Sequence, residues 1–240
     1  ECGGNLIYCK FIEEECPAVF EPLNPEAVPC FNGDVSGDAI NLGENSQYSV
    51  VQGNTISNWG NAGVSSRADF VVIKDNTISI NNDEGEPRLT KSGDSVLIQG
   101  IANQVIGNII TNSHKAGIDV RFLQVQEETD GKDCDQIYTG GFNIIRSNEV
   151  TTSAADNCFK IRTNNNVVVS NTARFSATKS GFNIDRDKEA VKNDCIHGGN
   201  DNYIADNVST SNSESGFKFE KTNNNVIVRN TATGNIKYGL

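Results

Sequence analysis

The stretch Asn166-Val167-Val168-Val169-Ser170-Asn171-Thr172-Ala173 recurs in varied form along the chain and decides its fold. A second clean copy, NVIVRNTA, occupies residues 225–232. The inner asparagines of the copies are Asn54, Asn76, Asn108, Asn148, Asn171, Asn207 and Asn230. They are separated by 22, 32, 40, 23, 36 and 23 residues. A period of 22 or 23 residues, lengthened by insertions, predicts a solenoid of stacked coils.

Each repeat has the pattern of three short strands. The first strand alternates, so Ile118 and Val120 point to one side while Asp119 points to the other. The second strand lies inside the asparagine phrase, and the third follows the inner asparagine. Hairpin signals such as a two-residue Asn-Gly loop between strands are missing, which argues against a meander. We therefore predict an all-β parallel β-helix whose equivalent strands stack about 4.8 Å apart.

The inner asparagine has two expected roles in such a fold. Asparagine tolerates the left-handed backbone conformation, so we expect it to adopt that conformation at a sharp, buried turn. Its side-chain amide is also expected to bond the asparagine one coil above and one coil below. Stacked asparagine ladders of this kind stabilise parallel strand stacks.

The net charge limits the partners. The chain has 20 basic and 31 acidic residues, a formal net charge of -11. This balance argues against nucleic acid and against an anionic membrane surface as partners.

No apolar run approaches the length that spans a membrane. The chain starts at Glu1 and contains no methionine, which is typical of a mature form whose leader has been removed.

Cysteine usage predicts an oxidising compartment. The first 30 residues hold Cys2, Cys9, Cys16 and Cys30, at spacings unlike common zinc sites, which favours disulfides. Asn207-Val208-Ser209 is an N-glycosylation sequon. We therefore expect a secreted, extracellular protein.

The chain divides into an N-terminal cap, residues 1–35, and a β-helix, residues 36–240. A solenoid exposes its first strand edge and the end of its core, and a short helix with a disulfide-tied loop would cover both. At the other end, Tyr238-Gly239-Leu240 begins a further first strand with no cap. Oligomerisation through that end is one alternative that the sequence leaves open.

The repeated pattern [G/S]-[I/F/V]-x-[I/V/F], followed by the asparagine phrase, resembles the right-handed parallel β-helix of the pectate-lyase-like superfamily. The resemblance covers about residues 36–240 and implies about seven coils. That superfamily includes polysaccharide lyases, glycoside hydrolases, esterases, epimerases and non-enzymatic adhesins. It implies a substrate groove across the first strand stack, walled by long loops. No family within the superfamily is identified.

The outward positions of the first strands form two ranks. The first rank is Asn41, Ser65, Leu97, Asp119, Lys160, Asn183 and Lys218, and the second is Gly43, Arg67, Gln99, Arg121, Arg162, Asp185 and Glu220. The last four coils are dense in ionisable groups, although such residues are poor strand formers. The charges therefore indicate either a functional site or cross-strand ion pairs, each worth about 0.2–1 kcal/mol.

Two long insertions follow the same first strand in different coils, at residues 123–141 and 187–200. Each holds one cysteine, and a Cys134–Cys195 disulfide would bridge the intervening coil and fix both loops as a wall of the groove. Long ordered loops without a repeat role are often functional. Cys158 begins a strand beside an apolar run, so we predict a buried free thiol.

Two catalytic mechanisms fit these residues. A lyase acting on a uronate polymer needs a cation for the carboxylate and a base for the adjacent proton, which Arg121, Lys160 and Arg162 would supply. A hydrolase needs two carboxylates, and Asp119 and Asp185 lie about two coils apart, near the upper end of the inverting range. The lyase is favoured, with all five as candidate catalytic residues. The candidate substrate-binding residues are Gln99, Asn183, Lys218 and Glu220.

We expect no required cofactor. A Ca²⁺ could bind Asp119, Asp185 and Asp187, but no spacing matches a calcium loop. The two histidines, His114 and His197, are expected to have plain surface roles.

The alternative function is a non-catalytic secreted protein that binds a glycan or another surface. Its support is the shortage of aromatic residues for sugar stacking and the lack of enzyme-family signatures. The arrangement of Asp119, Lys160 and Asp185 distinguishes the two: convergence in a cleft favours an enzyme, and mutual pairing favours a scaffold. Ice binding by the Thr and Ser ranks of the third strands is disfavoured because Glu149 and Arg174 interrupt them.

Overall fold

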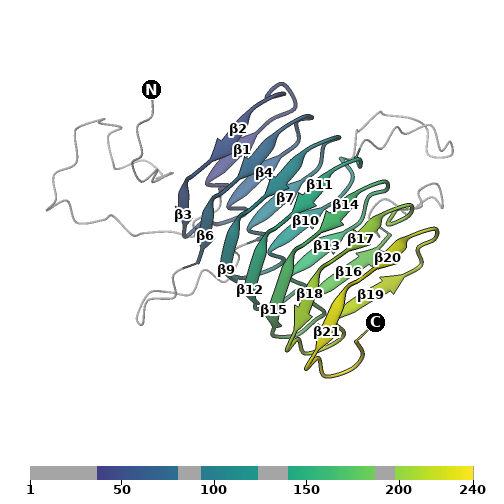
Figure 1. Cartoon of the computed structure of the whole chain (residues 1–240). Coiled ribbons are helices and arrows are strands. Elements are labelled where there is room, and N and C mark those ends of the chain that lie inside the picture. The colour runs from purple at the N-terminus through teal and green to yellow at the C-terminus, as the bar shows by residue number, and fades with distance from the viewer. Residues whose placement is uncertain (1–36, 81–92, 124–139, 187–197, 240) are drawn as a thin grey trace, which may run out of the picture.

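The computed structural model describes residues 37–80, 93–123, 140–186 and 198–239, which form a parallel β-helix of seven coils (Figure 1). Each coil gives one strand to each of three seven-stranded parallel sheets, and no α-helix occurs within these ranges. The arrangement fits the predicted right-handed β-helix. The predicted cap, residues 1–35, lies outside the described residues. None of the described segments forms a helix long and apolar enough to cross a membrane.

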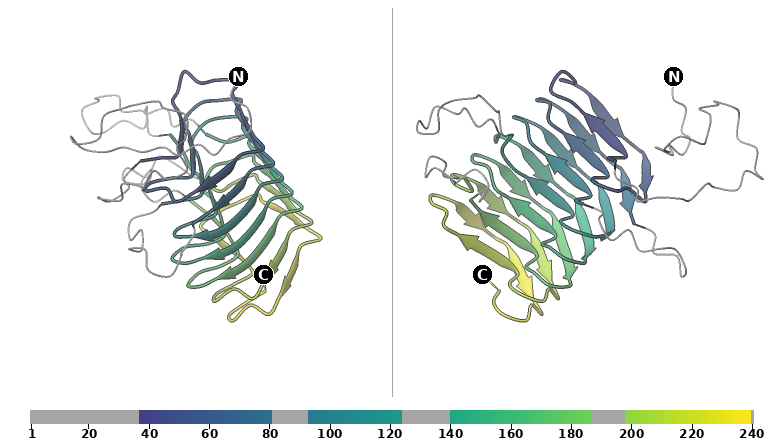
Figure 2. Two further views of the ribbon diagram at one scale, coloured as in Figure 1. Left: turned by 90° about the vertical axis from the view of Figure 1, so that its left-hand side faces the viewer. Right: turned by 180° about the vertical axis from the view of Figure 1, so that it is seen from behind.

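The three sheets run along the whole axis, as Figure 2 shows from two further sides. Sheet 1 contains β1 (Ile40–Leu42), β4 (Val64–Ser66), β7 (Val96–Ile98), β10 (Ile118–Val120), β13 (Phe159–Ile161), β16 (Phe182–Asp185) and β19 (Phe217–Glu220). Sheet 2 contains β2 (Val50–Gln52), β5 (Val72–Lys74), β8 (Gln104–Ile106), β11 (Ile144–Arg146), β14 (Val167–Val169), β17 (Tyr203–Ala205) and β20 (Val226–Val228). Sheet 3 contains β3 (Thr55–Ser57), β6 (Thr77–Ser79), β9 (Ile109–Ser113), β12 (Glu149–Ser153), β15 (Thr172–Ser176), β18 (Val208–Thr210) and β21 (Thr231–Thr233).

The inward side chains of successive coils stack on like neighbours. Phe182 lies between Phe159 and Phe217, with ring centroids 4.5 and 4.8 Å away and nearly parallel planes. Ile118, the register partner of Phe159, and Val120, the register partner of Ile161, are fully buried in the next coil. Full burial of such a side chain contributes about 1.5–3 kcal/mol. This core fixes which residues of each first strand face outward.

The asparagine ladder is confirmed. The Nδ2 of each inner asparagine donates to the Oδ1 of the next, from Asn54 to Asn230, at 2.9–3.0 Å. The backbone N–H of each also donates to that same Oδ1. The ladder therefore ties the backbone of every coil to the next.

The predicted backbone conformation of the inner asparagine is wrong by one residue. All seven inner asparagines are described, and none has a positive φ. The left-handed residue is the one before each, at Gly53, Asp75, Gly107, Ser147, Ser170, Asp206 and Arg229. The asparagine leads directly into the third strand, so the preceding residue makes the turn and aims the amide inward.

A second asparagine ladder, which we did not predict, runs beside sheet 2. It uses the residue that opens the asparagine phrase, which is an asparagine in the last five of the seven copies. The backbone N–H groups of Asn103, Asn143, Asn166 and Asn202 each donate to the Oδ1 of the next member, ending at Asn225, at 2.8–3.0 Å. Both ends of the phrase are therefore structural.

Cys158 is a buried free cysteine, as predicted. Burial raises the pKa of its thiol to about 12. A thiol that stays protonated is a weak nucleophile. Cys158 therefore acts as a small apolar core residue.

Candidate functional site

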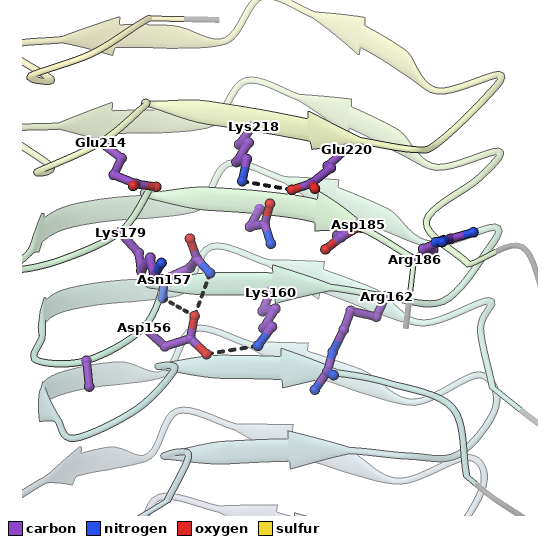
Figure 3. A pocket seen from close by; sticks show the side chains of 12 residues that line it. Asp156, Asn157, Lys160, Arg162, Lys179, Asp185, Arg186, Glu214, Lys218 and Glu220 are labelled. Carbon is purple, nitrogen blue, oxygen red and sulfur yellow. Dashed lines mark hydrogen bonds and ion pairs between the residues drawn. The ribbon is translucent and has the colours of Figure 1, made fainter. Parts of the chain in front are cut away.

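A groove of about 400 Å³ lies over β13, β16 and β19 on the outer face of sheet 1 (Figure 3). Its lining comprises Ala155, Asp156, Asn157, Lys160, Arg162, Lys179, Asn183, Asp185, Arg186, Glu214, Lys218 and Glu220. Six of these are predicted site residues: Lys160, Arg162, Asn183, Asp185, Lys218 and Glu220. Within the described part of the chain, the last three coils thus bring most of the candidates together.

Strand register places these side chains on one face. Asn183 of β16 is the Cα partner of Lys160 in β13 and of Lys218 in β19. Two residues further on, Asp185 is the partner of Glu220. Since side chains alternate along a strand, both predicted outward ranks are correct here.

The two lysines of the first rank are each paired with a carboxylate. Lys160 Nζ lies 2.9 Å from Asp156 Oδ2, and Lys218 Nζ lies 2.8 Å from Glu220 Oε2 (Figure 3). The hydrogen bond that Lys218 donates to Glu220 raises the pKa of Lys218. Lys218 therefore stays protonated near neutral pH and is unsuited to act as a base.

Asp119 and Arg162 form a buried ion pair beside the groove. Only 3% of Asp119 and 8% of Arg162 is exposed. Arg162 Nε donates to Asp119 Oδ1 at 3.2 Å, and its Nη2 donates to Asp119 Oδ2. Asp119 is not among the described residues that line the groove. Its carboxylate holds the guanidinium of Arg162 in place, which weakens the hydrolase hypothesis that paired it with Asp185.

Asn183 is the buried polar residue at the centre of the groove. It lies in the middle strand of the three, lines the groove and is 7% exposed. Its Oδ1 is buried and accepts no hydrogen bond within the described ranges. This oxygen is therefore an unpaired acceptor in a residue that lines the groove.

A second group of ionisable residues lies toward the N-terminal coils. Asp94 comes just before β7, and its Oδ1 accepts the backbone N–H of Ala116 at 3.0 Å. Burial raises the pKa of Asp94 to about 7; the negative charge of Asp119 adds to this, and Arg121 and Lys160 oppose it. The Nε of Arg121 is buried and has no hydrogen-bond partner in the described part of the chain. Sequence reasoning identified Arg121 but missed Asp94.

Gln99 and Arg121 do not belong to the groove lining. Gln99 Nε2 instead donates to the backbone oxygen of Phe122 at 3.5 Å. Both residues belong to the second rank, as predicted, in the coils of β7 and β10. The structure therefore separates them from the six candidates over β13, β16 and β19.

Other lining residues that sequence reasoning missed lie immediately before the first strands. Asp156, Lys179 and Glu214 belong to a rank of alternating charge that begins at Lys115 and ends at Lys237. Backbone bonds join Lys179 to Glu214 and Glu214 to Lys237, and Lys237 Nζ lies 2.8 Å from Glu214 Oε1. The sign alternation at one repeat position was the signal that could have revealed this rank.

The remaining predicted sites have different outcomes. Asn207 is fully buried, and its Nδ2 donates to Val168 O and Asn230 Oδ1, so a glycan on this nitrogen would break the ladder.

No group of three or more His, Cys, Asp or Glu able to hold a metal ion exists among the described residues. His114 is partly exposed. The residues outside the described ranges are Asp187, His197 and the six cysteines of the predicted disulfides, Cys2, Cys9, Cys16, Cys30, Cys134 and Cys195.

The β-helix and its groove are the features from which a function can be inferred. Neither the outward ranks nor the asparagine phrase defines a family. No protein-family model, no curated protein and no solved structure matches this chain.

Proposed function

We propose that this protein binds an acidic, uronate-containing polysaccharide in the groove over β13, β16 and β19. The observation that carries the proposal is the charge of the lining. The groove has five basic and four acidic residues among those described, whereas the whole chain has 20 basic and 31 acidic residues. Cations gathered in a groove attract an anionic ligand to that place on an otherwise acidic protein.

The pairing of the lysines favours recognition over catalysis. Lys160 and Lys218 each bond a neighbouring carboxylate, and the pKa of Lys218 is raised, away from the value a base needs. The same carboxylates can accept hydrogen bonds from sugar hydroxyls. Extracellular glycan binding also agrees with the resemblance to the pectate-lyase-like superfamily and with the expected secretion.

Replacing Lys160 or Lys218 by methionine tests the proposal. We expect each change to weaken binding of an oligogalacturonate or oligomannuronate hexamer about tenfold, because a charge-assisted hydrogen bond is lost. Isothermal titration calorimetry gives the affinity. Lys74→Met is the matched control, since Lys74 pairs with Asp75 at 3.6 Å and belongs to sheet 2. Equal affinity of Lys160→Met, Lys218→Met and Lys74→Met, or equal binding of a neutral glucose hexamer, would contradict the proposal.

A lyase is the second candidate function, favoured by Asp94. A carboxyl with a pKa of about 7 suits a general base at neutral pH, and Arg121 and Lys160 lie close enough to affect that pKa. In this mechanism Asp94 removes the proton beside the uronate carboxylate while a cation stabilises the charge that develops. The electron pair then forms the C=C bond of the unsaturated product and expels the glycosidic oxygen on the next carbon, which takes up a proton from water.

The lyase makes a distinct prediction about pH. Because Asp94 acts only when ionised, the rate should rise with pH through about 7 and level off above it. The absorbance of unsaturated uronate products measures the rate. Asp94→Asn should abolish it, and Asp75→Asn, outside this group, should leave it unchanged. Absence of product from the unaltered protein on every uronate polymer would rule out the lyase and leave the binding proposal standing.

A further inference from the structure

We propose that Asn183 determines the specificity of the groove because its Oδ1 accepts a hydrogen bond from one unsubstituted hydroxyl group of the bound sugar chain. The inference rests on the proposed function, since it assigns a ligand group to the same groove. It adds that the preferred polymer is one that is not O-acetylated at this hydroxyl.

The position of Asn183 is the first support. Its strand, β16, pairs with β13 on one side and β19 on the other, so Asn183 lies at the middle of the lining. It is 7% exposed, and its Oδ1 is buried without a hydrogen bond in the described part of the chain. Buried polar atoms in native proteins nearly always have a partner, so an exception in a groove points to a ligand.

The flanking residues do not supply that partner. Lys160 and Lys218 are the register neighbours of Asn183, but their ammonium groups lie 2.9 and 2.8 Å from Asp156 and Glu220. Both lysines have three N–H donors and can bond a sugar carboxylate at the same time. Asn183 therefore lies between two ion pairs, and its buried oxygen receives no hydrogen bond from either lysine.

The chemistry of the donor follows from these neighbours. An amide oxygen accepts and never donates, so the ligand must present an O–H or N–H group. Two lysine ammonium groups beside the site repel a ligand ammonium, and the other donors of a uronate chain are its hydroxyl groups, which leaves a hydroxyl. An acetylated oxygen has no hydrogen to donate. A site built to bond a hydroxyl discriminates strongly against an analogue that lacks it, because the buried acceptor then stays unpaired.

The experiment compares two ligands and three proteins. The ligands are a uronate hexasaccharide with free hydroxyls and the same hexasaccharide carrying about one O-acetyl group per sugar. The unaltered protein should bind the acetylated chain at least about tenfold more weakly. Asn183→Leu should bind the free chain about tenfold more weakly than the unaltered protein and should bind both chains alike.

The control occupies the same outward rank on a distant coil. Asn41 of β1 is exposed and lies outside the groove, so Asn41→Leu should keep the affinity and the preference of the unaltered protein. If Asn183→Leu does not fold, as judged by circular dichroism, then Asn183→Val replaces it, because β-branched residues suit strands.

Two results would overturn the role of Asn183. One is equal binding of free and acetylated chains by the unaltered protein, and the other is a preference that persists in the Asn183 variant. Failure of the proposed function is a different result, namely that the unaltered protein binds neither chain.

Discussion

Asn171→Ala is expected to destabilise the folded chain by about 3–5 kcal/mol, since it leaves several buried polar groups without partners. The Nδ2 of Asn171 donates to Ile145 O at 2.9 Å, Val169 O at 3.0 Å and Asn207 Oδ1 at 3.0 Å. Its Oδ1 accepts both the backbone and the side-chain N–H of Asn148 at 3.0 Å. Alanine cannot replace any of these bonds.

The midpoint of urea denaturation, followed by circular dichroism, measures this loss. Asn41→Ala is the matched control, because Asn41 is exposed on β1 and outside the ladder. Its midpoint should stay near that of the unaltered protein. If Asn171→Ala and Asn41→Ala had the same midpoint, the ladder would not be a main source of stability.

Asp119→Asn is expected to destabilise the chain by about 3 kcal/mol, because it removes the buried carboxylate that accepts from both Nε and Nη2 of Arg162. The two residues are 3% and 8% exposed, so water screens the lost interaction very little. The double variant Asp119→Leu/Arg162→Met should recover most of the loss, since a packed apolar pair can replace a buried ion pair.

Thermal denaturation of the single and double variants checks this second expectation. The control is Asp206→Asn, which makes the same change in the exposed pair formed with Arg229. The pKa of Asp206 is lowered by that arginine, but the pair is open to solvent, and its loss should hardly change the melting temperature. A loss at Asp206→Asn equal to that at Asp119→Asn would contradict the role assigned to burial.

The register of the fold could be predicted because two independent patterns agree on it. The asparagine phrase marks one point in each coil, and the alternation of residues such as Ile118, Asp119 and Val120 decides which side faces the core. A slip of one residue would have turned every charge of the groove inward. The Cα pairing of Lys160, Asn183 and Lys218 shows that no slip occurs.

The details of the groove could not be predicted, because they depend on side-chain rotamers and on loops. Sequence alone places Asp119 on the outer face but does not show that Arg162 reaches across to it. The sequence also does not reveal that Lys160 forms an ion pair with Asp156, or that the Oδ1 of Asn183 has no hydrogen-bond donor. The raised pKa of Asp94 arises from burial, which has no marker in the local sequence.

The groove combines both arrangements that the sequence analysis treated as alternatives. Charged side chains converge over β13, β16 and β19, and the lysines among them are paired with carboxylates. Such a surface holds its donors and acceptors in fixed positions before a ligand arrives, which favours binding. We propose that Asn183, whose Oδ1 has no donor within the described ranges, accepts a hydrogen bond from the ligand.

A crystal structure of the protein soaked with a uronate hexasaccharide tests the central claim most directly. We predict a sugar chain lying across β13, β16 and β19, with a carboxylate beside Lys160 or Lys218 and a hydroxyl donating to Asn183 Oδ1. A chain bound on sheet 2 or sheet 3 with the groove empty, or no bound sugar at saturating concentration, would contradict it.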